Sequence, residues 1–180
     1  MMFEGVAGAE AERVRRMLDR QEILDCVHRC CRGVDRLDRE LLLSAYHPGA
    51  IDDHGVFRGT VEEFADWAFA GHRANHRGHH HYVMNHTCDL DGDVAHTETY
   101  YIFVGQNRTG TPVTLHGGRY VDRFERRAGR WAIAYRVSLL EWVGGVTEPD
   151  LPPVERRPGG VVARDRTDSS YARPLGPIEG

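Results

Sequence analysis

The stretch His79–Gly105, HHHYVMNHTCDLDGDVAHTETYYIFVG, decides the fold. Two runs rich in β-branched and aromatic residues, 79–90 and 94–105, flank the turn sequence Asp91-Gly92-Asp93, a pattern typical of a β-hairpin. Two further strand-like runs follow, at 111–126 and 130–142. The turn residues Arg108-Thr109-Gly110 precede the first run, and Ala128-Gly129 separate the two. The pattern predicts an antiparallel meander of four long strands.

Upstream of the meander, the hydrophobic period becomes helical. Asp19 is a candidate N-cap with Glu22 placed to complete a capping box, so a helix is predicted from there to about Asp35. Some helix is expected before Asp19 as well. The apolar stripe of the helix consists of Leu24, Val27, Cys31 and Val34.

Two shorter helices are predicted next. One begins after the N-cap Asp38 and runs through Tyr46, and the other opens with the capping box Thr60/Glu63 and ends by Gly78. Three helices followed by a meander define an α+β fold in which the helices cover one face of a curved antiparallel sheet.

The chain divides into three parts. Residues 1–18 are expected to form a partly helical extension, frayed at its start, and residues 19–147 a single domain. Residues 148–180 are rich in proline and glycine, which favours a loop, a disordered end, or an arm on a neighbouring subunit.

Composition narrows the class of protein. Of 180 residues, 41% are hydrophobic and 28% charged, as in globular domains. The net charge of −4 argues against a nucleic-acid partner. No run reaches the roughly 20 apolar residues of a membrane span, and no signal peptide is recognisable. Four cysteines without a C-x-x-C pair favour a reducing compartment, so we expect a cytoplasmic protein.

Asp35 is unusual because it lies at the predicted C-terminus of a helix, where a carboxylate opposes the helix dipole. It is either a solvated residue that pairs with Arg36 or Arg39, or a buried functional carboxylate.

The strand that starts at His79 is unusual for its histidines. Strand periodicity places His79, His81, Val83 and Asn85 on one face. An imidazole that faces a cavity is suited to general base catalysis, above all when a carboxylate holds its other ring nitrogen. His79 and His81 also suggest a metal pair, but no third ligand follows at a short offset, so no metal site is predicted.

Arg136 lies in the last strand among small residues. Trp131, Ile133, Tyr135, Val137 and Leu139 form one face, and Ala132, Ala134, Arg136, Ser138 and Leu140 the other. The second face suits the lining of a cavity, where a guanidinium must meet an anion or form a salt bridge, with Asp35, Glu98 or Glu141 as candidates. The first face would be a liability if exposed, so we expect a homodimer or homotrimer to cover it.

Several side chains are candidates for contact with a substrate. They combine hydroxyl, thiol, amide and aromatic groups, and they are Tyr46, Cys30, Trp67, Asn85, Tyr101, Tyr120 and Ser138.

These residues, in this order, resemble the SnoaL-like family. The matching segments, within about Asp19–Trp142, are Arg20-Gln21-Glu22-Ile23, Gly33-Val34-Asp35-Arg36, Ser44-Ala45-Tyr46-His47-Pro48, Asp53-His54-Gly55, Phe57-Arg58-Gly59, His81-Tyr82-Val83-Met84-Asn85, Gly92-Asp93-Val94-Ala95 with Glu98, and Gly129-Arg130-Trp131. The resemblance implies the cone-shaped nuclear-transport-factor-like fold, with a pocket between helices and sheet.

The resemblance also implies a function. The family includes scytalone dehydratase, bile acid 7α-dehydratase and hexachlorocyclohexane dehydrochlorinase, which are lyases without a cofactor. It implies that His81 and Asp35 form a catalytic dyad and that Arg136 assists a departing anion. Cys30 departs from the Lys or Tyr that these lyases carry at the matching position. The expected function is a dehydratase-like elimination or isomerisation of an apolar cyclic or polycyclic molecule. Alternatives are a polyketide cyclase, a ligand-binding protein, or the small non-catalytic subunit of a ring-hydroxylating dioxygenase.

Overall fold

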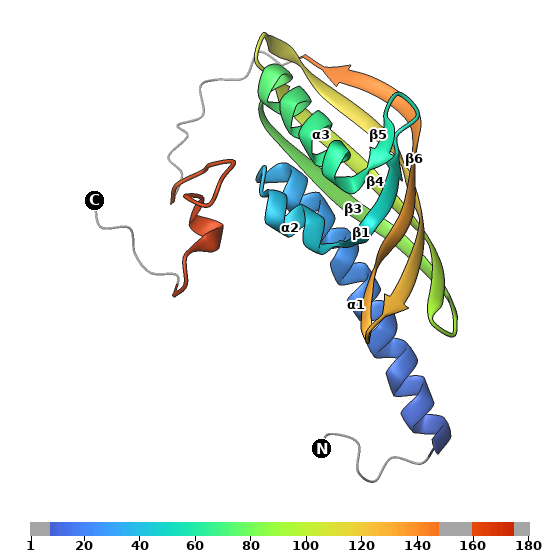
Figure 1. Ribbon diagram of the computed structural model, residues 1–180. Coiled ribbons are helices and arrows are strands. Elements are labelled where there is room, and N and C mark those ends of the chain that lie inside the picture. Colours follow the sequence, from blue (N-terminus) through green and yellow to red (C-terminus); the bar gives the residue numbers. More distant parts are fainter. Residues whose placement is uncertain (1–7, 148–159, 175–180) are drawn as a thin grey trace.

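Three helices lie on one side of a curved six-stranded sheet (Figure 1). The computed structural model describes residues 8–147 and 160–174. The elements are α1 (Gly8–Asp35), α2 (Arg39–Ser44), β1 (Tyr46–Asp53), β2 (Arg58–Thr60), α3 (Val61–Asn75), β3 (His76–Asp91), β4 (Val94–Asn107), β5 (Gly110–Arg127), β6 (Arg130–Val146) and a short 3₁₀ helix, η1 (Ser169–Tyr171). The α+β class and the four-strand meander are confirmed. The expected fraying of residues 1–7 lies outside the described residues.

The sheet has the strand order β2-β1-β6-β5-β4-β3. Strands β3 to β6 pair antiparallel as predicted, while β1 pairs with β6 in parallel. Consequently β1 and β3, which are separated by three strands, lie near opposite margins of the sheet.

Helix α1 is longer than predicted, and Asp19 is not its N-cap. The helix begins by Gly8, so Asp19 lies in its interior. The carboxylate of Asp19 instead accepts hydrogen bonds from Nε1 of Trp131 at 2.8 Å and from Arg126 at 2.9 Å. A carboxylate oxygen of Glu22 accepts one from the backbone N–H of Trp131. Both acidic residues therefore fasten α1 to the β5–β6 hairpin.

The caps of the two shorter helices are confirmed. Asp38 caps α2 through the N–H of Leu41, and Thr60 and Glu63 form the capping box of α3. Helix α2 ends at Ser44, earlier than predicted, because Tyr46 already belongs to strand β1, opposite Ile133 of β6.

The prediction of one apolar face along β6 is wrong. A register shift between Arg123 and Phe124 interrupts the alternation of β6, so Trp131 and Ile133 are fully buried on the helix side. The outer face keeps Tyr135, Val137 and Leu139, which pair with residues of β5.

The described part of the C-terminal segment, residues 160–174, packs against the chain's own helices. Arg36 pairs with Asp168, Arg32 donates to Ser170, and the hydroxyl of Tyr171 donates to Asp38 at 2.8 Å. Within residues 8–147 and 160–174, no helix is long and apolar enough to cross a membrane.

Gly33 provides a test of the packing between α1 and α2. A Cβ at this position would lie 2.5 Å from the backbone nitrogen of Leu42, whereas nothing lies within 4 Å of a Cβ at Gly71, which is also helical. Gly33→Ala should therefore destabilise the protein by about 1–3 kcal/mol through overpacking. Gly71→Ala should stabilise it by about 0.5–1 kcal/mol through helix propensity. Urea unfolding of both variants checks the pair, and equal effects would contradict the close approach.

Candidate functional site

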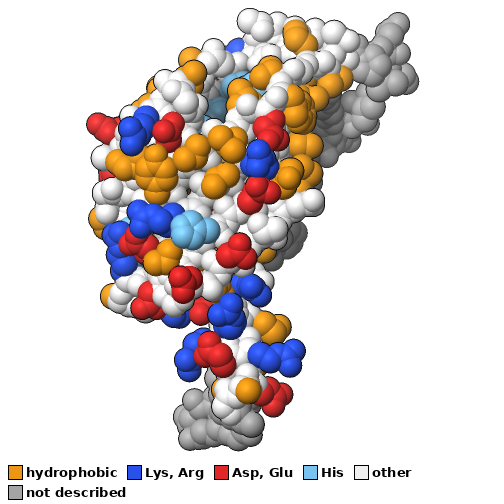
Figure 2. Space-filling view, turned by 90° about the vertical axis from the view of Figure 1, so that its right-hand side faces the viewer, with side chains coloured by type: hydrophobic (Ala, Val, Ile, Leu, Met, Phe, Trp, Pro, Cys, Tyr) orange, Lys and Arg blue, Asp and Glu red, His pale blue; other side chains and the backbone are white. Residues whose placement is uncertain are grey.

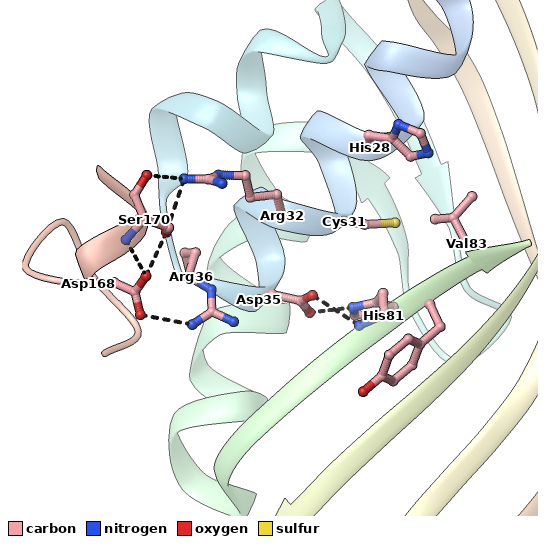
Figure 3. A pocket seen from close by; sticks show the side chains of 10 residues that line it. His28, Cys31, Arg32, Asp35, Arg36, His81, Val83, Asp168 and Ser170 are labelled. Carbon is pink, nitrogen blue, oxygen red and sulfur yellow. Dashed lines mark hydrogen bonds and ion pairs between the residues drawn. The ribbon is translucent and has the colours of Figure 1, made fainter. Parts of the chain in front are cut away.

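The end of helix α1 directs Asp35 toward the sheet. Leu37 adopts a left-handed conformation (φ 51°), and the N–H groups of Leu37 and Asp38 donate to the carbonyls of Val34 and Gly33. This is a Schellman motif, which terminates a helix sharply. Asp35, in the last helical turn, is buried and faces strand β3 (Figure 3).

Asp35 binds His81 through two hydrogen bonds (Figure 3). Its Oδ1 lies 2.7 Å from Nδ1 of His81, and its Oδ2 accepts the backbone N–H of the same residue at 3.0 Å. A carboxylate at Nδ1 fixes the imidazole as the tautomer whose Nε2 lone pair is free. Among the described residues, no hydrogen bond engages Nε2 of His81.

The solvated alternative for Asp35 is wrong. Arg36 pairs with Asp168 at 3.3 Å, and Arg39 pairs with Asp66 at 2.7 Å, so neither arginine is the partner of Asp35. The carboxylate is left to the imidazole of His81.

A cavity of about 200 Å³ lies between the helices and the sheet. The side chains that line it are Cys30, Cys31, Val34, His54, Phe64, Trp67, Ala68, His72, His76, His81, Tyr101, Phe103, His116, Tyr120 and Arg136. His81 also borders an outer groove of about 560 Å³ between α1, β3 and the C-terminal segment, which Figure 3 shows. His81 therefore stands in the wall between cavity and groove.

Arg136 is 1% exposed and forms a salt bridge with Asp122. Its Nε and one terminal nitrogen donate to the two carboxylate oxygens at 2.7 and 2.6 Å, a bidentate pair. The expected partners are wrong, because Asp35 binds His81 while Glu98 and Glu141 bind Arg119 on the outer face. Burial opposes the charge of Arg136 most strongly, but the attraction and hydrogen bonds of Asp122, together with the neighbouring Tyr46 and Cys30, outweigh it and raise the pKa of Arg136 well above its usual value.

A chain of buried contacts leads from Arg136 to His54. The other terminal nitrogen of Arg136 donates to Sγ of Cys30, which lies 3.4 Å from the hydroxyl of Tyr46. That hydroxyl donates to Oδ2 of Asp52 at 2.6 Å, and Oδ1 of Asp52 lies 2.6 Å from Nδ1 of His54. Burial raises the pKa values of Cys30 and Tyr46, so both stay protonated near neutral pH.

The predicted substrate-contact residues divide into three groups. Cys30, Trp67, Tyr101 and Tyr120 line the cavity. Tyr46 and Ser138 are buried behind its wall, with Tyr46 bound to Asp52 and Ser138 bound to the hydroxyl of Tyr101.

Asn85, the remaining candidate, is on the wrong side of the strand. A register shift between Val83 and His86 reverses the alternation of β3, so Asn85 is exposed while the ring of His86 bonds the buried hydroxyl of Thr99.

Three more histidines near the junction of α3 and β3 were missed as a group. His72 stacks on His79 with ring centroids 3.9 Å apart, its Nδ1 lies 3.2 Å from that of His76, and His116 faces the same cavity. Burial lowers the pKa of His72 to about 2 and that of His79 to about 4, and it lowers those of His76 and His116. These imidazoles are therefore neutral at neutral pH. The close spacing of His72, His76 and His79 across the end of a helix was the sequence signal that could have indicated this cluster.

His79 links strand β3 to helix α1. Its Nε2 bonds the carbonyl of Val34 at 3.1 Å and lies 3.9 Å from Asp35. In the described part of the chain, no three His, Cys, Asp or Glu side chains converge as a metal site would require. All four cysteines are free and buried.

A helical layer over a curved sheet, with a polar cluster in the cavity between them, defines a class of small α+β domains. The sequence profile of the SnoaL-like domain matches residues 15–137. The chain belongs to this family, and the nuclear-transport-factor-like cone fold expected from the sequence is confirmed. Among curated proteins, no sequence matches the chain significantly.

Solved structures show the same fold. A hexachlorocyclohexane dehydrochlorinase, LinA type 2, is similar with a TM-score of 0.72 and 19% identity, over 80% of this chain and 99% of that one. A predicted scytalone dehydratase from Novosphingobium aromaticivorans has a TM-score of 0.66 and 14% identity, over 79% and 97%. A predicted aromatic ring hydroxylase from the same species has a TM-score of 0.64 and 23% identity, over 72% and 94%. At these identities the likeness concerns the fold alone.

The buried pair Arg136–Asp122 should be essential for stability. Arg136→Met leaves the carboxylate of Asp122 buried without a cation, which we expect to cost about 3–5 kcal/mol. The double variant Arg136→Met/Asp122→Leu should recover most of this loss. Urea unfolding measures both, with Arg119→Met as a control on the outer face, where the midpoint should change little. A single variant as stable as the native protein would contradict the pairing.

Proposed function

We propose that this protein is a cofactor-independent lyase that removes a proton from a small apolar cyclic substrate through His81. Membership in the SnoaL-like family supports lyase-like or cyclase chemistry at the level of the family. The observation that carries the proposal is the 2.7 Å bond between Asp35 and Nδ1 of His81, at the wall of the cavity between the helices and the sheet.

His81 acts as the general base and Asp35 as its positioning residue. With Nδ1 held by the carboxylate, Nε2 takes the substrate proton and Asp35 stabilises the imidazolium that forms. Arg136 and the neutral donors around it favour the negative charge that develops on the substrate. The hydroxyl of Tyr46 is less suited to this role, because its proton is donated to Asp52.

The size and walls of the cavity favour a compact substrate. A cavity of about 200 Å³ is smaller than the roughly 300–1,000 Å³ typical of drug-sized ligands. Phe64, Trp67 and Phe103 supply apolar walls. We therefore propose a one-ring or two-ring substrate rather than a sterol, and a polyketide cyclase would need the cavity to enlarge.

A ligand-binding protein or a small oxygenase subunit is the second candidate. The similarity to a predicted aromatic ring hydroxylase favours it. This candidate makes the protein indifferent to the loss of either member of the dyad, whereas the lyase requires both.

A homodimer or homotrimer is proposed to cover the outer face of the sheet. Figure 2 shows hydrophobic side chains on this face, interspersed with charged ones. Three residues of β4, β5 and β6 are each more than one third exposed, namely Tyr100, Val121 and Leu139. Val121 stands opposite Val137 in the register, so their side chains form one apolar strip.

The dyad is tested by separate changes to its two members. His81→Ala should lower the rate of elimination from small cyclic β-hydroxy and β-chloro ketones about 10²–10⁴-fold, because the base is lost. Asp35→Asn should lower it comparably, since an amide that donates to Nδ1 forces the proton onto Nε2. The exposed His80→Gln is the matched control on the same strand and should keep full activity. Unchanged turnover in His81→Ala with an unchanged melting temperature would refute the lyase.

The covered face is tested by light scattering in solution. The native protein should have the mass of a dimer or trimer. Val137→Glu should shift it toward the monomer, because a carboxylate in the apolar strip loses its hydration on association. A native protein that is monomeric at micromolar concentration would contradict this arrangement.

A further inference from the structure

His54 and Asp52 form a second imidazole–carboxylate pair that faces the same cavity. Nδ1 of His54 lies 2.6 Å from Oδ1 of Asp52, which is fully buried. The ring of His54 stacks on Phe64 with centroids 4.7 Å apart and lies beside Trp67 at 5.9 Å. Among the described residues, no hydrogen bond engages either ring nitrogen of His54, because the approach of Nδ1 to Asp52 is an ion-pair contact without hydrogen-bond alignment. The side chain lines the cavity.

The pair stands apart from the dyad of Asp35 and His81. His54 follows strand β1, while His81 lies in β3, near the opposite margin of the sheet. Both imidazoles nevertheless line the same cavity of about 200 Å³.

Charge balance in the interior indicates what His54 does. In the register of the sheet, Arg136 lies between Asp52 of β1 and Asp122 of β5. Its guanidinium is bidentate on Asp122. Among the described residues, Asp52 accepts a hydrogen bond from the neutral hydroxyl of Tyr46, and its Oδ1 lies at ion-pair distance from Nδ1 of His54. Two carboxylates and one guanidinium leave one net negative charge in this row, and Asp52 carries it next to the ring of His54.

Among the described residues, no second charged side chain forms an ion pair with the ring of His54. The aromatic rings against it are Phe64 and Trp67 of α3, and the charged group in contact is Asp52 of β1. The carboxylate therefore acts on an imidazole that packs against two aromatic rings and is 23% exposed.

We propose that His54, held by Asp52, is the proton donor to the leaving group, and that the reaction is the elimination of water rather than of a halide. This inference rests on the proposed lyase function. In this arrangement His81 is the general base and His54 is the general acid, and both line the same cavity.

The elimination balances as follows. Nε2 of His81 takes the proton next to a carbonyl, and the electron pair of that C–H bond becomes the new C=C bond. The C–O bond at the neighbouring carbon breaks, and its oxygen takes the bonding pair and a proton from Nε2 of His54, leaving as water. His81 ends protonated and His54 neutral. His81 then releases one proton to solvent and His54 takes one up, which restores both.

The role of an acid depends on the leaving group. Hydroxide departs slowly unless it is protonated, whereas chloride departs as a stable anion without a proton. Loss of His54 should therefore affect the two substrates differently, and loss of His81 should affect them equally.

The experiment compares 3-hydroxycyclohexanone with 3-chlorocyclohexanone, both of which give 2-cyclohexenone. His54→Gln should lower kcat/KM for the hydroxy ketone about 10²–10⁴-fold and leave that for the chloro ketone within about threefold. Asp52→Asn should show the same selectivity, because the charge that holds the imidazolium is lost while the hydroxyl of Tyr46 keeps an oxygen acceptor.

Two controls separate the causes of a loss. His54→Phe keeps an aromatic ring against Phe64, so a selective loss in this variant as well excludes a simple packing defect. His80→Gln, exposed on β3, should retain both rates.

Equal losses for the two ketones in His54→Gln, or no loss for either, would overturn the role of His54 while leaving the lyase intact. Retention of both rates in His81→Gln would instead overturn the lyase itself.

Discussion

The hydrogen bond between Asp35 and His81 joins two parts of the chain that local sequence does not bring together. Asp35 ends a 28-residue helix, and His81 lies in a strand 46 residues later. A carboxylate at a helix C-terminus is unfavourable by itself, and Leu37 adds a left-handed conformation that favours glycine. Two charge-assisted contacts to one residue offset both costs, and they fix at once the position of the helix, the strand and the imidazole tautomer.

The row of charges across β1, β6 and β5 sets the character of the cavity. Because Asp122 matches Arg136 with two hydrogen bonds, the guanidinium behaves as a neutralised donor rather than as a free cation. His72 and His79 are uncharged near neutral pH, since burial lowers their pKa values. A small apolar substrate can therefore enter this polar site without displacing water from an unpaired charge.

Local rules predicted most of the fold and only part of the site. Side-chain caps at Asp38 and Thr60 and glycine turns act over a few residues, so they can be read from one sequence. The face of Asn85 could not be predicted, because a single register shift in β3 reverses the alternation, and the sequence shows no glycine or proline at that point. Asp122 was missed for a related reason. It becomes the partner of Arg136 only through the β5–β6 register, which strand patterns do not specify.

The position of His81 between the cavity and the outer groove bears on how a base is regenerated. A proton accepted by His81 must return to solvent before the next turnover. The groove on the other side of His81 is lined by Arg32, Asp35 and Ser170, among other polar groups, and is larger than the cavity (Figure 3). The C-terminal segment contributes Asp168 and Ser170 to this groove and is anchored to α1 by Arg36. The segment therefore shapes the solvent side of the dyad, while the helices and the sheet shape its substrate side.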